Sequence, residues 1–416
     1  MSFSIAVAAR AARLAARSIA TLSSNVKNQL LRDIADELIS QSDAILAANK
    51  RDLEQAKIAG LDVSMQDRLM LSEERLQSIR QAVLQIEQQR DPVGSINQIE
   101  RQPSGIRVGK MRIPLGVIAM IYESRPNVTI DAAALCLKAG NAVILRGGKE
   151  AIHSNLALAA CIHRALEKHN LDPAIVTVVP DTDRAVMNEL MTLSDDVDLI
   201  IPRGGEGLIR FVSKHSQIPV IQHFKGVCHL YIDKAADLVK GLALLQNGKT
   251  QRTSVCNSLE TLLVHQSVAS EFLPMAAAMF AQHKVKVHAC PKSIGFFDGA
   301  VAATEDDWHA EYLALEIAIR VVDNFDQAVE HIALYGSGHT EVIVSQDYSA
   351  TNEFIRVVDS AVVMANASSR FSDGGELGLG AEIGISTSKL HAYGPMGALS
   401  LTTEKFVVYG DGEVRK

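Results

Sequence analysis

The sequence predicts an α/β protein of two or three domains built around parallel, doubly wound sheets. Three observations lead to this prediction. The chain has 416 residues, too many for a single hydrophobic core. Apolar residues at helical spacing dominate the first 90 positions, and strand-like and helix-like segments alternate from residue 116 onward. Repeated strand–helix units of this length are typical of a parallel sheet.

The expected elements follow one another in a regular order. Residues 1–90 have the helical pattern, and the run 91–94 (Asp-Pro-Val-Gly) ends it. An alternating, strand-like stretch follows at 99–123, with a turn near 103–105. The first α/β series is expected as strands at 116–121, 142–145, 175–179 and 199–201, with helices at 130–139, 154–169 and 184–193. The second is expected as strands at 227–232, 259–264, 317–322 and 341–344, with helices at 235–246, 268–281 and 326–334.

The composition is that of a soluble, globular protein. Hydrophobic residues make up 47% of the chain and charged residues 21%, with a formal net charge of −7. No basic tract suggests nucleic acid, and no apolar run is long enough to span a membrane. Five cysteines without a framework spacing indicate a reducing compartment, so we expect a cytoplasmic protein. We expect no metal, because signatures such as CxxC and HExxH are missing.

The first 24 residues allow two interpretations. They contain arginines and serines and no acid, which is the composition of an organellar transit peptide. The helical pattern continues after a short break into residues 27–49, without a cleavage-like junction. We therefore expect an amphipathic helix that stays in the folded protein.

Cys256 stands out as a candidate nucleophile. It follows a basic, polar loop at 249–254 and precedes an apolar, strand-like run at 259–264. Neighbouring cations and a polar, partly exposed setting favour the reactive thiolate. The other cysteines lie in apolar patterns or in a short turn and are expected in the core: Cys136, Cys161, Cys228 and Cys290.

Seven motifs carry a resemblance to a known superfamily. They are IYESRPNV (121–128), LRGGKEA (145–151), IPRGGEGLI (201–209), HFKGVCHLYID (223–233), SVCNSLETLLVH (254–265), YGSGHTEVIV (335–344) and RFSDGGELGLGAEIGIST (370–387). In this order they resemble the aldehyde dehydrogenase superfamily, along essentially the whole chain. Within it they are most similar to the γ-glutamyl phosphate reductases, also called glutamate-5-semialdehyde dehydrogenases.

The resemblance implies an aldehyde dehydrogenase-like α/β fold. A Rossmann-type cofactor domain, an α/β catalytic domain and a small β oligomerisation segment are expected. The implied boundaries are 1–96, 114–226 and 355–399 for the NADP-binding domain, 227–354 for the catalytic domain, and 97–113 and 400–416 for oligomerisation. The two oligomerisation segments read as alternating strands that would otherwise be unpaired edges.

Five residues are expected to hold the cofactor. Relatives carry a ribose-binding lysine after the second strand, with an acid three residues on, where this chain has Arg146 and Lys149. A lysine attracts a 2′-phosphate that an acid would repel, so NADPH/NADP⁺ is expected. A solvated basic pair is the alternative. Glu311 has the spacing of the glutamate that holds the nicotinamide ribose in relatives, and Gly204 and Gly205 belong to a matched motif.

Two departures from the relatives bear on the chemistry. Hydrolytic relatives have a glutamate that activates water, and this chain has His223 in that place. Where relatives have an oxyanion-donating asparagine, the chain has Ser124, with Arg125 beside it. Loss of the acid and gain of positive charge suit a doubly anionic acyl phosphate. Ser124 is therefore a candidate catalytic residue together with Cys256.

Further residues are candidates to bind the substrate. Arg125, Lys249 and Arg252 are expected to hold its phosphate or its α-carboxylate, and a role as mere surface cations is the alternative for each. His223 and His339 are also candidates, with a structural role as the alternative for His339.

The resemblance implies NADPH-dependent reduction of L-glutamyl 5-phosphate to L-glutamate 5-semialdehyde and phosphate through a Cys256 thioester. This is the second step of proline synthesis from glutamate. One alternative is another oxidoreductase of the same fold, which makes an acid or an acyl-CoA from a small aldehyde. The other is a noncatalytic scaffold for glutamate 5-kinase. The expected partners are further copies of the chain and, transiently, that kinase, with neither nucleic acid nor membrane.

Overall fold

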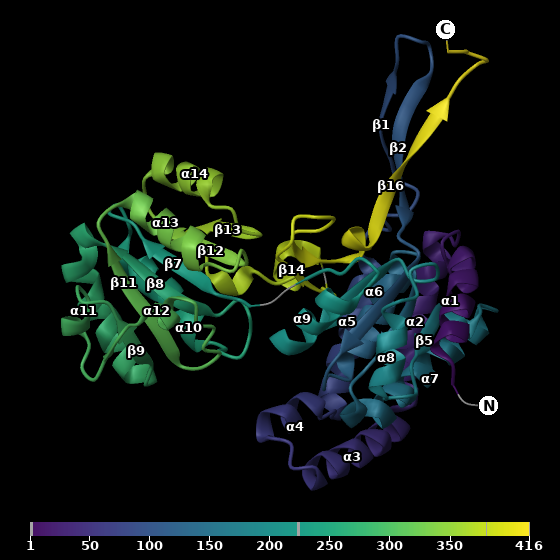
Figure 1. Cartoon of the computed structure of the whole chain (residues 1–416), viewed down its shortest axis with the longest axis horizontal. Coiled ribbons are helices and arrows are strands. Elements are labelled where there is room, and N and C mark those ends of the chain that lie inside the picture. Colours follow the sequence, from purple (N-terminus) through teal and green to yellow (C-terminus); the bar gives the residue numbers. More distant parts are fainter. Residues whose placement is uncertain (1–2, 223–224, 380, 416) are drawn as a thin grey trace. The chain divides into compact units, whose positions relative to one another are not determined.

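The chain folds into two compact units in the computed structural model, which describes residues 3–222, 225–379 and 381–415 (Figure 1). Unit 1 comprises Met1–Gln222, Gly378–Gly384 and Met396–Lys416. Unit 2 comprises His223–Leu377 and Ile385–Pro395. Among the described residues, no helix combines the length and the apolarity needed to cross a membrane.

Residues 355–377 and 385–395, which the resemblance groups with the cofactor-binding segments, lie in unit 2. Pairing in the sheet explains the difference, because β13 (Val362–Ala365) lies parallel to β12 (Thr340–Val344) and extends the sheet of unit 2. Two short strands, β14 (Gly384–Ser386) and β15 (Gly394–Met396), form a separate two-stranded sheet.

Unit 1 begins with a group of helices, as the sequence predicts. These are α1 (Ile5–Ile19), α2 (Ser24–Ser40), α3 (Ser42–Ile58), α4 (Val63–Leu69) and α5 (Glu73–Gln88). Side-chain oxygens cap four of them by accepting a backbone N–H in the first turn: Ser4, Ser23, Asp62 and Ser72. Ile5, Ala9 and Ala12 of α1 lie on one face and join the core of unit 1. The amphipathic first helix is thus part of the folded core.

The parallel sheet of unit 1 has the order β5-β4-β3-β6. Its strands are β3 (Val117–Tyr122), β4 (Ala142–Arg146), β5 (Val176–Val178) and β6 (Leu199–Arg203), and its helices are α6 (Asn127–Lys138), α7 (Ile152–Lys168), α8 (Arg184–Leu190) and α9 (Glu206–His215). Every residue of β3 is buried, as expected for a strand covered on both faces. Because β4 and β6 flank β3 on opposite sides, the strand order reverses there. Doubly wound sheets bind ligands at the carboxyl ends of strands at such a point.

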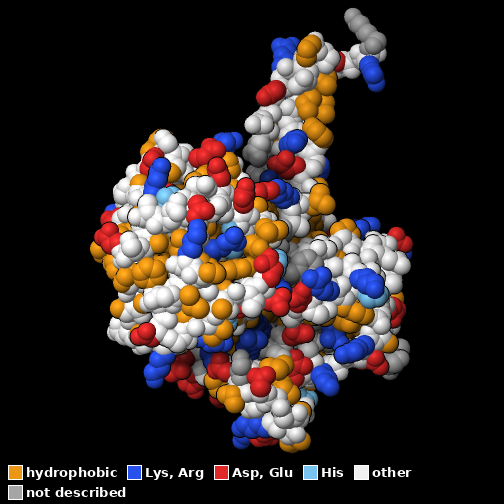
Figure 2. All heavy atoms as spheres, turned by 60° about the vertical axis from the view of Figure 1, so that its left-hand side comes forward, with side chains coloured by type: hydrophobic (Ala, Val, Ile, Leu, Met, Phe, Trp, Pro, Cys, Tyr) orange, Lys and Arg blue, Asp and Glu red, His pale blue; other side chains and the backbone are white. Residues whose placement is uncertain are grey.

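A second, antiparallel sheet in unit 1 joins the two segments predicted to oligomerise. Its order is β1-β2-β16, from β1 (Ile96–Arg101), β2 (Arg107–Pro114) and β16 (Thr402–Tyr409). Figure 2 shows hydrophobic side chains along this sheet, and Ile99, Phe406 and Val408 are among the exposed ones. Its outer strands leave backbone groups available for pairing with another chain.

Unit 2 contains a seven-stranded parallel sheet with the order β10-β9-β11-β8-β7-β12-β13. Its further strands are β7 (Cys228–Ile232), β8 (Leu259–His265), β9 (Lys286–Ala289), β10 (Val301–Ala302) and β11 (Glu316–Val322), and its helices are α10 (Leu238–Thr250), α11 (Gln266–His283), α12 (Glu305–Trp308), α13 (Phe325–Tyr335) and α14 (Tyr348–Val357). Successive residues of β8 face opposite sides, so Leu262 and Leu263 join two different cores. This buried strand anchors the loop 251–258 that carries Cys256.

Candidate active site

Cys256 lies in the loop between α10 and β8 and is half-buried, whereas the other four cysteines are buried. Burial raises the pKa of the Cys161 thiol to about 11, and it also raises the pKa of Cys136 and of Cys228. These three thiols therefore stay protonated near neutral pH. Cys256 remains the accessible cysteine, which is the property a nucleophile requires.

The backbone of Cys256 is held by the start of β7. A Cβ added to Gly226 would lie 2.0 Å from the Cys256 carbonyl oxygen and 2.7 Å from its Cα, so this close approach requires glycine. The Cys228 thiol donates to the same carbonyl over 3.2 Å. Gly226 N–H in turn donates to Glu311 Oε1 over 2.8 Å. Glu311, predicted to hold the cofactor ribose, thereby contributes to holding the cysteine loop.

Gly226→Ala is expected to lower kcat/KM by roughly 100-fold, because a misplacement of about 1 Å costs that much and the new methyl must displace the Cys256 backbone. We expect a modest stability loss of about 1–3 kcal/mol from overpacking. Steady-state kinetics and urea unfolding measure the two effects. Gly295→Ala is the matched control in unit 2, since a Cβ there meets nothing within 4 Å. Wild-type kinetics in Gly226→Ala would show that catalysis does not depend on the close approach of Gly226 to the Cys256 backbone.

The other side of the cysteine loop is held by residues 368–372. Asn257 Nδ2 donates to the Ser372 carbonyl over 2.9 Å, and Ser369 Oγ donates to the Asn257 carbonyl over 2.7 Å. Arg370 Nε donates to Gln251 Oε1 over 2.8 Å. Arg370 is not among the predicted site residues, although it lies in the glycine-rich motif that resembles the superfamily. The structure places it beside the loop that bears the candidate nucleophile.

The structure corrects the expectation for Lys249. Its ammonium is fully buried and donates to the Leu259 carbonyl over 2.8 Å and to Glu260 Oε2 over 2.7 Å. Burial lowers the pKa of Lys249 and raises the pKa of Glu260 to about 7. A lysine committed to this buried pair does not offer its charge to a substrate. Arg252, by contrast, is exposed on the loop.

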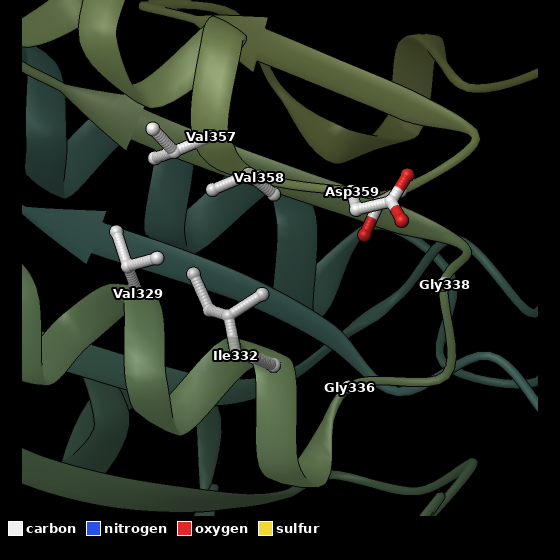
Figure 3. Close-up of a pocket in the computed structure, with 9 residues that line it drawn as sticks. Val329, Ile332, Gly336, Gly338, Val357, Val358 and Asp359 are labelled. Carbon is white, nitrogen blue, oxygen red and sulfur yellow. The ribbon is translucent and has the colours of Figure 1, made fainter.

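The loop Gly336–His339, a motif of the resemblance, also lies close to the start of β7. Ser337 Oγ accepts the Val227 N–H over 3.0 Å. His339 is buried, and its Nδ1 lies 2.8 Å from Thr340 Oγ1 and 3.6 Å from the Cys228 sulfur. Gly336 and Gly338 also line a cavity of about 230 Å³, whose walls carry apolar residues of α13 and α14 (Figure 3). His339 thus contacts Cys228, whose thiol donates to the Cys256 carbonyl. The other predicted histidine, His223, lies outside the described residues.

In unit 1, the loops after β3, β4 and β6 meet at the carboxyl ends of their strands. Ser124 donates its N–H and its hydroxyl to Glu150 Oε1 over 2.8 and 2.6 Å. Gly205 N–H donates to Glu123 Oε2 over 2.9 Å. The Ser124 hydroxyl, predicted to stabilise an oxyanion, is thus engaged by Glu150 in this structure. Arg125 is exposed beside it.

The same edge fits an anionic dinucleotide. Nothing lies within 4 Å of a Cβ added to Gly205, so space is open there, and the glycine turn 147–148 leads into Lys149, which is exposed. Arg146 donates to the Thr182 carbonyl over 2.8 Å, while its Nε is buried without a hydrogen-bond partner among the described residues. Burial lowers the pKa of Arg146. Arg146 and Lys149 flank a glycine turn at the carboxyl end of β4, next to the strand where the order of the sheet reverses. Doubly wound sheets bind nucleotide phosphates at such a place.

Comparison with known proteins shows the family to which the chain belongs. The model of the aldehyde dehydrogenase family matches residues 3–294. The chain is 59% identical to the γ-glutamyl phosphate reductase of Colwellia psychrerythraea over 100% of this chain and 99% of that protein, and 58% identical to that of Salinibacter ruber over 97% and 92%. The crystal structure of γ-glutamyl phosphate reductase from Thermotoga maritima matches with a TM-score of 0.96 and 42% identity, covering 99% of this chain and 100% of that one. An acetylating aldehyde dehydrogenase from Geobacillus thermoglucosidasius, 17% identical over 99% and 97% of the two chains, shares the fold with a TM-score of 0.71.

The chain belongs to the aldehyde dehydrogenase family, an enzyme family with a parallel α/β fold. This confirms the predicted fold class. Within it, the chain belongs to the γ-glutamyl phosphate reductases, as the motifs predicted.

Proposed function

We propose that this protein reduces L-glutamyl 5-phosphate to L-glutamate 5-semialdehyde and phosphate with NADPH, the second step of proline synthesis from glutamate. The observation that carries the proposal is the setting of Cys256: an accessible thiol on a loop fixed from both sides, in a chain whose other cysteines are buried. Membership of the γ-glutamyl phosphate reductases supports the choice of substrate.

In the proposed mechanism, the Cys256 thiolate attacks the γ-carbonyl carbon, phosphate leaves, and a thioester remains. The Cys256 N–H is the proposed oxyanion donor, a contribution often worth about 3–4 kcal/mol. Ser124 can add a second donor only after its hydroxyl leaves Glu150. His223 in place of the water-activating glutamate favours a thioester that survives until it is reduced.

The proposed cofactor residues in unit 1 are Arg146, Lys149, Gly204 and Gly205. Lys149 is exposed, so it is accessible to a 2′-phosphate, and this favours NADPH over NADH. When bound, NADPH supplies the hydride that converts the acyl group to the aldehyde level. Collapse of the resulting thiohemiacetal releases the aldehyde and restores the Cys256 thiolate. Glu311 stays a proposed ribose contact, with its link to Gly226 as a second role.

We further propose that the chain forms a homo-oligomer in the cytoplasm through the sheet of β1, β2 and β16. Exposed apolar side chains on β16 and the available strand edges support this proposal. A transient contact with glutamate 5-kinase would shorten the time for which the unstable acyl phosphate meets water.

The reverse reaction tests the proposed function. Purified protein is expected to reduce NADP⁺ with glutamate 5-semialdehyde only when inorganic phosphate is present, because phosphate must resolve the Cys256 thioester. Absorbance of NADPH at varied phosphate concentrations measures this. Equal rates without phosphate would favour the aldehyde-oxidising alternative, and a requirement for coenzyme A would favour the acylating one. A protein that forms no NADPH with any acceptor would favour the scaffold.

A further inference from the structure

The side chain of Arg370 is oriented toward the cysteine loop and has a buried N–H group without a protein acceptor among the described residues. Its side chain is half-buried and is oriented by the hydrogen bond from Nε to Gln251 of the cysteine loop. Its Nη1 is buried and makes no hydrogen bond to any residue that the structure describes. A buried guanidinium N–H without an acceptor is costly, so such groups are normally satisfied by protein, water or ligand.

The backbone around Arg370 is rigidly tied to the candidate nucleophile. Ser369 Oγ donates to the Asn257 carbonyl over 2.7 Å, and Asn257 Nδ2 donates to the Ser372 carbonyl over 2.9 Å. Thr340 on β12 donates to Ser372 Oγ over 2.7 Å and fixes the segment from the other side. Because Asn257 directly follows Cys256, these bonds fix the backbone on both sides of Arg370 relative to the backbone of Cys256.

Several ionisable side chains lie close to the Arg370 guanidinium. Burial is the main cause that lowers the pKa of Arg370, and repulsion from Arg252 lowers it further. Asp373, Cys256 and Cys228 are close enough to raise that pKa when they are negatively charged. Asp373 also accepts the Gly375 N–H over 2.9 Å. Two guanidinium groups that repel each other beside a nucleophile are stabilised by a dianion that binds both.

We infer that Arg370, together with Arg252, binds the phosphate group of the acyl phosphate and the inorganic phosphate that leaves from it. This inference rests on the proposed function and assigns its phosphate subsite. The phosphate is bonded through one oxygen to the carbon that Cys256 attacks, whereas the α-carboxylate lies at the far end of the substrate. A cation fixed beside the cysteine loop therefore meets the phosphate. Arginine suits this task because its planar fork matches phosphate oxygens.

Arg370→Gln is expected to raise the KM for inorganic phosphate in the reverse reaction by about 10- to 100-fold, the range for loss of a charge-assisted hydrogen bond. The KM for glutamate 5-semialdehyde should change by less than about threefold, because the aldehyde carries no phosphate. Arg252→Gln should shift the phosphate KM in the same direction. Arg356→Gln is the matched control, since Arg356 is an exposed arginine of α14 paired with Glu353, and its kinetics should equal those of the wild type.

A second measurement does not depend on turnover. Inorganic phosphate should slow alkylation of Cys256 by iodoacetamide in the wild-type protein and should fail to do so in Arg370→Gln and, partly, in Arg370→Lys. A slower alkylation rate in Arg370→Gln with intact phosphate protection would mean that Arg370 only activates the thiol, and the inference would be wrong. An unchanged phosphate KM in a phosphate-dependent enzyme would also overturn it while leaving the proposed function intact. Loss of phosphate dependence in the wild type itself would instead end the proposed function.

Discussion

Cys256→Ala is expected to abolish turnover, with kcat reduced by at least about 10⁴-fold, because no thioester can form without the sulfur. The substitution removes one sulfur atom from a half-buried side chain and leaves the backbone contact with Gly226 in place. NADPH binding, measured by titration of its fluorescence, should therefore stay within about threefold of the wild type. Residual activity above about 1% of the wild-type kcat would contradict a nucleophilic role.

Cys161→Ala supplies the control for this prediction. Cys161 is buried in α7, and burial raises the pKa of its thiol to about 11, so it takes no part in chemistry near neutral pH. We expect wild-type kinetics and a stability loss of about 1 kcal/mol from the small cavity. Labelling supports the comparison: iodoacetamide should modify one cysteine in the native wild-type protein and none in Cys256→Ala.

The regular elements were predictable where one physical signal dominated. The strands Val117–Tyr122 and Leu259–His265 are fully or almost fully buried. The continuous apolar run of the first and the mostly apolar run of the second, interrupted by Glu260 and Thr261, indicate this burial. The helix Tyr348–Val357 was missed because it is only 10 residues long and buries a single residue, Phe354, while Tyr348 and Ile355 are exposed. The strand Lys286–Ala289 was missed because it is short and carries lysine and histidine. Both errors come from elements whose position depends on neighbours far along the chain.

The candidate site shows a similar division. The polar, basic residues before Cys256 predicted a partly exposed thiol, and Cys256 is the cysteine that the structure leaves half-buried while the other four are buried. The burial of Lys249 could not be read from composition, since it depends on Glu260, an acid inside an apolar strand. Arg370 was missed because its relation to Cys256 arises from tertiary hydrogen bonds between distant segments. Sequence patterns indicate local exposure, whereas pairing between charged groups requires the fold.

Lys249→Met is expected to destabilise unit 2 by about 3–5 kcal/mol, because it leaves the Glu260 carboxylate buried without its partner. The single tryptophan, Trp308, is buried in unit 2, so its fluorescence during urea unfolding reports on this unit. Lys240→Met is the matched control on the same helix, since Lys240 is exposed and forms a surface pair with Asp237. The control should change stability by less than about 0.5 kcal/mol.

The sign of the pH dependence gives an independent test of the same ion pair. In the native protein the pKa of Glu260 is raised from 4.5 to about 7, mainly by burial. The folded state therefore binds a proton more readily than the unfolded state, and this group's contribution to stability falls as pH rises from about 4.5 to about 7. Removing the lysine raises that pKa further and extends the loss to higher pH. Lys249→Met should therefore be more destabilised relative to the wild type at pH 8 than at pH 5.

A double variant measures how much of the stability comes from the interaction between Lys249 and Glu260 and how much comes from each residue alone. Lys249→Met combined with Glu260→Gln removes both charges, so it should recover much of the stability that either single change loses. Because Lys249 and Glu260 lie at the two ends of the loop that carries Cys256, their pair also fixes the span of that loop. The double variant should therefore regain stability while its kcat stays below that of the wild type. Equal losses in the single and double variants would show that the two charges do not stabilise each other.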